Sequence, residues 1–456
     1  MATRYLGRAI MDTRHLITGR PDQDVFPTLR YAWYAVAVLL VVYSIAFVDR
    51  IILNLLVQPI RADLGLSDTG ISLLQGLAFT IFYSIFGLIL GRWADRNNRK
   101  RMIIAGVIVW CLATAACGFA QNFWQLFVAR IFVGAGEAAL SPAAYSLICD
   151  SFRREHRSRA ISTYSMGIYV GIGSALIFGG IVVAATSSAG MIRLPLLGEQ
   201  AAWRASLIVV GLVGLLAVLL LMTLKEPSRK EVTKTDGSFR DALGFFRSRL
   251  RPLGTVMLAN ALVALMTYSI SAWLPSYFIR VFGWSASQIA TAYGTVMLTV
   301  GCAGVVFGGW LVDRLTASGR INAMMLVFRW SFAALLLTAG WMGFVGSPAI
   351  AVLLLGVTCF LIGIPTGLGP AAINAITPNQ YRGQAVAIYL FFTALIGLGI
   401  GPTAVALITD YVFKSDVAVG MSLGTVLVVA SLIAAILLFS GSGSYNRALK
   451  DSQVER

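Results

Sequence analysis

Residues 91–101 read Gly-Arg-Trp-Ala-Asp-Arg-Asn-Asn-Arg-Lys-Arg, so that basic side chains crowd a short polar stretch. Apolar runs flank it on both sides, at roughly 70–91 and 102–120. A helix needs about 20 apolar residues to cross a bilayer. A basic loop between two runs of this length predicts a tight turn at the surface of a membrane.

The composition of the whole chain agrees with a membrane protein. Of its 456 residues, 58% are hydrophobic and 12% are charged, whereas an ordinary soluble domain has about 45–50% and about 25%. So few charged side chains cannot cover the surface of a water-soluble protein of this length. The composition therefore argues against a soluble enzyme, a DNA-binding domain and a disordered scaffold.

Apolar runs of spanning length recur along the chain. They lie at roughly 32–57, 70–91, 102–120, 123–148, 160–186, 203–224, 252–279, 287–311, 322–345, 348–374, 383–409 and 419–441. We therefore expect an all-α membrane protein with twelve transmembrane helices, an even number that leaves both ends of the chain on one side.

Lysine and arginine gather in the loops on one side of the expected membrane. The net charge is +16, and the basic residues concentrate at 92–101, 153–159 and 225–251, while the opposite loops hold few. This positive-inside bias puts both termini in the cytoplasm. We expect a multi-pass protein of the plasma (inner) membrane that acts as a monomer, contacts membrane lipids and binds no nucleic acid.

The longest polar connection divides the spans into two sets of six. We expect a cytoplasmic tail at 1–30, a six-helix bundle at 31–225, a cytoplasmic linker at 226–251, a second six-helix bundle at 252–441 and a cytoplasmic tail at 442–456. The halves repeat each other, since Gly91-Arg-Trp-Ala-Asp95 closes the second span and Gly309-Trp-Leu-Val-Asp313 closes the eighth. Secondary transporters are built from such repeats and bind substrate between them near the middle of the membrane.

The loop at 91–101 resembles the signature loop of the major facilitator superfamily, which reads Gly-x-x-x-Asp-Arg/Lys-x-Gly-x-Arg/Lys-Arg/Lys. Asn98 stands where the family usually has its second glycine, and asparagine also tolerates a left-handed turn. The signature residues implied here are Gly91, Asp95, Arg96, Arg99 and Lys100, with a weaker copy at Gly309, Asp313 and Arg314. The resemblance implies two pseudo-symmetric six-helix bundles, with Asp95 holding a contact between them in one conformation.

Four charged residues lie within the predicted spans and away from the helix ends: Asp49, Arg50, Arg130 and Glu137. A charge at the bilayer centre is costly unless it is paired or hydrated, so such residues mark functional sites. Arg130 and Glu137 share one helix face, about 10 Å apart. Asp49 and Arg130 lie at matching depths in their spans, which allows a contact between them.

The segments around these charges look like the spinster family of lipid transporters, including its bacterial members. The matching segments are Phe47-Val-Asp49-Arg50, Ala129-Arg130-Ile-Phe-Val-Gly134-Ala-Gly136-Glu137-Ala138, Asp150-Ser-Phe, Arg157-Ser-Arg159-Ala and Ala272-Trp273-Leu-Pro275. Organic-anion symporters of the same superfamily show a similar Asp-Arg and Gly-Glu-Ala pattern.

This resemblance implies a role for each buried charge. Asp49 and Glu137 would take up and release protons, Arg130 would be the partner that switches their proton affinity, and Arg50 would anchor an anionic head group. The alternative is a set of static ion bridges that only fix helix packing, but buried ion pairs are poor stabilisers.

Three further side chains carry weaker expectations. Tyr268 and Trp273 are expected to line a cavity for an amphiphile. Arg329, one to two turns from the end of the ninth span, is expected to extend its guanidinium to the membrane interface.

The sequence thus predicts a transporter without catalytic or metal-binding residues. No Gly-x-x-x-x-Gly-Lys-Ser/Thr phosphate loop occurs, so we expect a proton gradient, with no cofactor, to drive alternating-access transport of an amphiphilic anion, of lysolipid or sphingolipid type. Two alternatives remain open: a proton-coupled symporter of a soluble organic anion, such as a sugar acid or carboxylate, and a non-transporting membrane receptor or scaffold.

Overall fold

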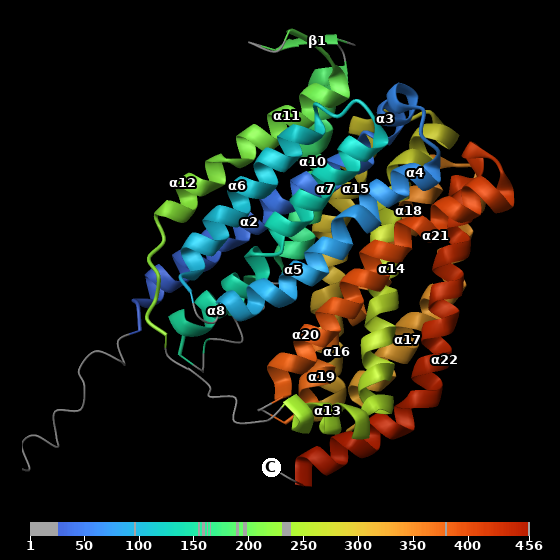
Figure 1. Ribbon diagram of the computed structural model, residues 1–456. Helices are drawn as coiled ribbons and strands as arrows, with labels where there is room; N and C mark the ends of the chain where they lie inside the picture. The colour runs from blue at the N-terminus through green and yellow to red at the C-terminus, as the bar shows by residue number, and fades with distance from the viewer. Residues whose placement is uncertain are drawn as a thin grey trace, which may run out of the picture.

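Long helices make up most of the protein (Figure 1). The computed structural model describes residues 26–94, 97–153, 156, 160–161, 163–164, 166–187, 191–194, 198–229, 239–378 and 381–454. Twelve of its helices are long and apolar enough to cross a membrane, which confirms the expected twelve-helix architecture. Most of the expected N-terminal tail and part of the linker lie outside the described residues, and the boundaries of the five segments stay a prediction.

The first six spans form one bundle, called here the N-bundle, coloured blue to green in Figure 1. Its helices are α2 (Leu29–Leu55), α3 (Val57–Leu64), α4 (Asp68–Ser72), the π-helical turn η1 (Leu73–Leu77), α5 (Ala78–Ala94), α6 (Arg99–Cys117), α7 (Phe123–Glu137), α8 (Leu140–Ser151), α10 (Gly167–Ser187), α11 (Ala202–Gly214) and α12 (Leu216–Met222). Between α10 and α11 in the chain, β1 (Met191–Leu194) pairs antiparallel with β2 (Gly198–Ala201).

The last six spans form the second bundle, called here the C-bundle. Its elements, with the preceding helix α13 (Phe239–Ser248), are α14 (Leu250–Phe282), α15 (Ala286–Val296), η2 (Met297–Gly301), α16 (Cys302–Ala317), α17 (Ala323–Thr338), η3 (Ala339–Phe344), α18 (Pro348–Thr366), α19 (Gly369–Ala375), α20 (Arg382–Phe392), η5 (Thr393–Ile400), α21 (Gly401–Leu407), η6 (Ile408–Phe413), η7 (Asp416–Ala418) and α22 (Val419–Val454). The π-helical turns η1 and η2 interrupt corresponding spans of the two halves, and such turns often occur at functional sites.

Asn98 has a different local role from the one expected of it. Its backbone is extended, with φ −71° and ψ 111°, and its side chain accepts a hydrogen bond from the backbone N–H of Arg101. Asn98 is therefore the N-cap of α6, a position at which asparagine is among the preferred residues. The left-handed turn that the family's glycine suggested does not occur at this residue.

Glycines let the two bundles approach closely. A Cβ atom added to Gly173 of α10 would lie 3.0 Å from the carbonyl oxygen of Gly294 of α15, and one on Gly294 would lie 2.8 Å from the carbonyl oxygen of Gly173. A Cβ on Gly76 of η1 would lie 2.4 Å from the carbonyl oxygen of Leu398 of η5. Small residues at helix crossings are the usual means of close packing in membranes.

Two ion pairs join the bundles at one end of the molecule, where α3 and α4 lie in Figure 1. Asp68 of α4 pairs with Arg280 of α14, and Arg61 of α3 pairs with Asp416 of η7. We call this the α3 end. The opposite end, with α8 and α13, is called the α13 end.

Candidate functional site

The four charged residues expected within the membrane come from two helices of the N-bundle. Asp49 and Arg50 lie on α2, and Arg130 and Glu137 on α7. Asp49, Arg130 and Glu137 expose only 1%, 3% and 1% of their surfaces. The fold therefore keeps all three away from the outer surface of the bundle.

The partner of Glu137 is Arg50. The Arg50 Nε donates to Glu137 Oε2 at 2.5 Å, and the two side chains are 9% and 0% exposed. The Arg50 guanidinium also lies over the rings of Phe47, Phe79 and Tyr83, at 5.1, 4.7 and 4.9 Å from their centroids. Aromatic faces attract a cation in this arrangement, so Arg50 is held by one carboxylate and three rings.

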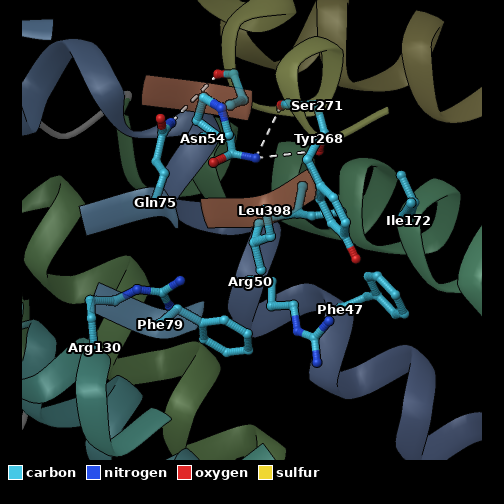
Figure 2. A pocket seen from close by; sticks show the side chains of 13 residues that line it. Phe47, Arg50, Asn54, Gln75, Phe79, Arg130, Ile172, Tyr268, Ser271 and Leu398 are labelled. Carbon is cyan, nitrogen blue, oxygen red and sulfur yellow. Dashed lines mark hydrogen bonds between the residues drawn. The ribbon is translucent and has the colours of Figure 1, made fainter. Parts of the chain in front are cut away.

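Arg130 makes its hydrogen bonds with backbone carbonyl groups. Its Nε donates to the carbonyl of Leu74 at 3.2 Å and its Nη1 to the carbonyl of Asp49 at 3.3 Å. Asp49 and Arg130 thus meet, as their matching depths allowed, but through the Asp49 backbone. Arg130 also lies 5.5 Å from the centroid of the Phe79 ring, which separates it from Arg50 (Figure 2).

The Asp49 carboxylate is buried without an ion-pair partner among the described residues, and its nearest donors are the neutral side chains of Trp110 and Thr114. Within the described part of the chain Oε1 of Glu137 has no hydrogen-bond partner. Burying a charged carboxylate without a cationic partner is more costly than burying a neutral polar group, so Asp49 is a candidate for taking up a proton.

A narrow cavity separates the two bundles next to these charges (Figure 2). It has room for about one or two water molecules. Its polar lining comprises Arg50, Asn54, Gln75, Arg130, Tyr268 and Ser271, and its apolar lining comprises Phe47, Ile51, Phe79, Ile172, Ala272, Leu398 and Pro402. Both bundles contribute, as expected for a site between two repeats.

Two amides of the N-bundle reach across the cavity to the C-bundle. Asn54 Nδ2 donates to the carbonyl of Ser271 at 3.0 Å, and Gln75 Nε2 donates to the carbonyl of Ala272 at 3.5 Å. Sequence reasoning missed both residues. Asn54 lies one helical turn after Arg50, and Gln75 interrupts an apolar run. Each is a polar residue within a predicted span, which is the feature that could have identified it.

The two aromatic expectations have opposite outcomes. Tyr268 lines the cavity. Trp273 is absent from its lining and is fully buried, with Nε1 donating to the carbonyl of Pro402 at 2.8 Å. The expectation for Trp273 was wrong because the rotation of α14 turns this side chain into the C-bundle. Its contacts fix α14 against α21.

A family model described as Major Facilitator Superfamily matches residues 39–402. The chain belongs to this superfamily. It is therefore a membrane transporter of the superfamily, and its fold and family are not those of an enzyme.

Proteins of several kinds within the superfamily are similar to this chain. It is 28% identical to an MFS-type efflux pump of Mycolicibacterium smegmatis, over 96% of this chain and 97% of that protein. It is 26% identical to Protein spinster of Drosophila melanogaster, over 66% of this chain and 50% of that protein. It is 24% identical to the hexuronate transporter of Bacillus subtilis, over 80% of this chain and 85% of that protein.

A solved structure has the same fold. It is the crystal structure of a bacterial homolog of the human lysosomal transporter Spinster, in an inward-facing and unoccupied conformation. The TM-score is 0.75 with 24% sequence identity, over 94% of this chain and 99% of that chain. The resemblance to the spinster family seen in the sequence is confirmed by this fold together with the Drosophila relative.

The described residues of the superfamily signature loop contact other segments of the N-bundle and the start of the linker. Arg99 is fully buried, pairs with Asp150 of α8 and donates from Nε to Glu226 at 2.7 Å. Lys100 donates from Nζ to the carbonyls of Met222 and Leu224 at 2.8 and 2.6 Å. These contacts attach the start of α6 to α8 and to the end of α12. Asp95 and Arg96 lie outside the described residues. A Cβ atom added to Gly91 would lie 3.9 Å from the Cβ of Pro142.

The copy of the signature loop in the C-bundle is more exposed than the described part of the loop in the N-bundle. Asp313 and Arg314 are exposed, and the Arg314 guanidinium lies 5.3 Å from the Trp310 ring centroid. A Cβ on Gly309 would meet no atom within 4 Å. Among the residues that the structure describes, neither Asp313 nor Arg314 makes an ion pair, so the two copies differ in their contacts.

Proposed function

We propose that this protein is a proton-coupled transporter of an amphiphilic organic anion of lysolipid or sphingolipid type, working by alternating access in the inner membrane with both termini in the cytoplasm. The observation that most supports this proposal is the Asp49 carboxylate. It is buried without an ion pair among the described residues, and its backbone carbonyl accepts a hydrogen bond from Arg130, which lines the cavity. An ionised carboxylate in such a place is costly, and taking up a proton removes that cost.

The charged residues around the cavity favour binding of one monoanion in each transport cycle. Arg50 and Arg130 bring two positive charges, and Glu137, paired with Arg50, brings one negative charge. When Asp49 carries a proton, the group has a net charge of +1 and attracts a monoanion. When Asp49 loses it, the group is neutral and the attraction disappears, so proton and anion would move together.

The lining of the cavity suits a substrate with one polar and one apolar part. Arg50 and Arg130 lie at one side, and the apolar side chains of Ile172 and Leu398 face the remaining space (Figure 2). A head group bound by a guanidinium would place its chain against these side chains. Apolar surface adds affinity at about 25 cal/mol per Å² buried.

The contacts between the bundles support an inward-facing state. The ion pairs described above close the α3 end, and the basic loops of the positive-inside bias lie at the α13 end. If the α13 end is cytoplasmic, these ion pairs close the outer end in this conformation, and the α3 end must separate for the other state.

A soluble sugar acid is the second candidate substrate. The amides of Asn54 and Gln75 face the cavity and could exchange their inter-bundle hydrogen bonds for substrate hydroxyl groups. The similarity to a hexuronate transporter also supports a sugar acid as the substrate. Arg50 and Arg130 would then bind the carboxylate.

Transport in proteoliposomes tests the proposal. With an inward-directed proton gradient, a labelled lysophospholipid should accumulate, and a hexuronate should neither accumulate nor compete; the reverse result would establish the second candidate. Asp49→Asn should keep counterflow but lose accumulation, because the amide cannot take up a proton. Glu199→Gln, an exposed change in β2, is the matched control. No counterflow of either substrate by the wild type would favour a receptor or scaffold.

A further inference from the structure

The lipid-facing side of α22 carries a notch near the α13 end. The exposed positions Phe439, Gly443 and Arg447 follow one another at intervals of four residues, so they lie on one face of the helix. A Cβ added to Gly443 would meet no atom within 4 Å. The missing side chain therefore leaves an open space on this face, between Phe439 and Arg447.

Arginines from three helices contact α22 within one turn of this space. Arg329 of α17 lies over the ring of Phe439 at 3.8 Å from its centroid, and Arg251 of α14 donates from Nη2 to the carbonyl of Ser440 at 3.4 Å. Arg447 of α22 donates from Nε to the carbonyl of Gly443 at 3.4 Å. We call Arg251, Arg329, Phe439, Gly443 and Arg447 the α22 notch.

Within the described residues no carboxylate pairs with the arginines of the notch. Arg329 Nε has no hydrogen-bond partner there. Asp451, one turn beyond Arg447 on the same helix, is paired with Arg249 at 3.6 Å. The notch therefore has an excess of positive charge and suits an anion.

The depth of the notch matches the head groups of a membrane leaflet. Twenty residues of helix separate Val419, the start of α22, from Phe439, which is about 30 Å and equals the thickness of the hydrocarbon layer. Gly443 and Arg447 then lie one and two turns further, among the head groups. Trp330, next to Arg329 and 71% exposed, is a typical residue for this interface.

The surface beyond Phe439 suits acyl chains. Leu432, Ile436 and Phe439 continue the same exposed face toward the α3 end, with 45%, 58% and 55% of their surfaces exposed. We propose that the α22 notch binds the phosphate of an anionic phospholipid whose acyl chains lie along this stripe. Three guanidinium groups supply the charge-assisted hydrogen bonds that phosphate oxygens prefer.

Lipid retention by the purified full-length protein tests this site. The protein is exchanged into detergent and supplied with phosphatidylglycerol, with phosphatidylcholine or with inorganic phosphate, and both lipid retention in native mass spectrometry and the melting temperature are measured. Phosphatidylglycerol should be retained and should raise the melting temperature by a few degrees, and the other two should do neither. An equal effect of phosphatidylcholine, or of inorganic phosphate alone, would overturn a site for an anionic lipid.

Two variants act on the site in different ways. Arg251→Gln/Arg329→Gln/Arg447→Gln removes the charge, and Gly443→Leu fills the notch while keeping the charge and favouring the helix. Both should lose at least tenfold in phosphatidylglycerol retention. Arg320→Gln, which changes an exposed arginine outside the notch, should retain the lipid as the wild type does. Wild-type retention by Gly443→Leu would refute the site even if the triple variant fails to fold.

Discussion

Arg280 holds Asp68 across the boundary between the two bundles, with Nη1 2.6 Å from Oδ2 and Nη2 2.7 Å from Oδ1. The Asp68 side chain is fully buried, and Arg61 adds a third contact at 3.1 Å. Arg61 in turn reaches Asp416 at 2.9 Å. We call Arg61, Asp68, Arg280 and Asp416 the α3-end network.

Arg61 keeps its charge throughout the physiological pH range. Partial burial lowers the pKa of Arg61, but the hydrogen bond with Asp416 and the negative charges of Asp68 and Asp416 outweigh this effect, and the net result is a raised pKa. Arg61 therefore stays a cation within the α3-end network over this pH range.

Asp68→Asn should favour separation of the bundles at the α3 end. The amide cannot neutralise Arg280, and removing one partner of a buried pair costs about 3–5 kcal/mol. Even about 3 kcal/mol changes the ratio of two conformations by more than a hundredfold. Spin labels at the exposed positions 62 and 417 should report a longer distance in pulsed electron paramagnetic resonance.

Asp63→Asn is the matched control for this change. Asp63 pairs with Arg204 at 2.9 Å at the same end, but both residues belong to the N-bundle and Asp63 is 40% exposed. A pair of this kind contributes about 0–1 kcal/mol, so the label distance should not change. An unchanged distance in Asp68→Asn as well would mean that the network does not hold the bundles together.

Glu137→Gln should separate substrate binding from proton coupling. Without the carboxylate, Arg50 has no ionic partner and is free to bind an anion, so affinity should rise or stay constant, while proton-driven accumulation should be lost. Counterflow and gradient-driven uptake in the same proteoliposomes measure the two properties. Accumulation at the wild-type level would remove Glu137 from the coupling mechanism.

The sequence predicted which charged residues lie inside the protein but not how they pair. Residue spacing correctly placed Asp49, Arg50, Arg130 and Glu137 on two helices. Asp49, Arg130 and Glu137 are buried, and the Arg50 side chain is 9% exposed. Residue spacing could not show that Arg50 faces Glu137 or that Arg130 faces backbone carbonyls. Those pairings depend on how α2 and α7 are rotated about their own axes. Packing against other helices helps to set that rotation, as where Phe47 of α2 meets Gly171 of α10.

The fold itself was easier to predict than the contacts of its loops. Hydropathy alone gives twelve spans because lipid admits only segments that satisfy their own backbone groups. The resemblance of 91–101 to the superfamily signature did not predict that Arg99 would be buried between Asp150 and Glu226. These partners are distant in the sequence, and only the folded N-bundle brings them together.

Arg130→Lys should lose at least tenfold in transport although it keeps the positive charge. Arg130 uses two separate nitrogens to bond Leu74 of η1 and Asp49 of α2, and the single lysine nitrogen cannot reproduce that planar arrangement. Uptake at saturating substrate measures the loss, and the melting temperature checks that the protein remains folded. Full uptake by the lysine variant would mean that charge alone suffices at this position.

Two glycine substitutions should distinguish a change in conformation from a loss of folding. In Gly76→Ala the new Cβ would lie 2.4 Å from the carbonyl of Leu398 in the other bundle, and in Gly134→Ala 2.3 Å from the carbonyl of Phe79 in the same bundle. Overpacking of this kind costs about 1–3 kcal/mol. The bundles can separate to relieve the first clash, whereas the second remains in every conformation.

Gly76→Ala should therefore lengthen label distances between the bundles with little change in melting temperature, and Gly134→Ala should lower the melting temperature without changing those distances. Gly87→Ala is the control, because its Cβ would meet no atom within 4 Å and alanine favours the helix by about 0.5–1 kcal/mol. If Gly76→Ala instead lowered the melting temperature as much as Gly134→Ala, the two bundles would not move as separate bodies, and alternating access about this contact would be excluded.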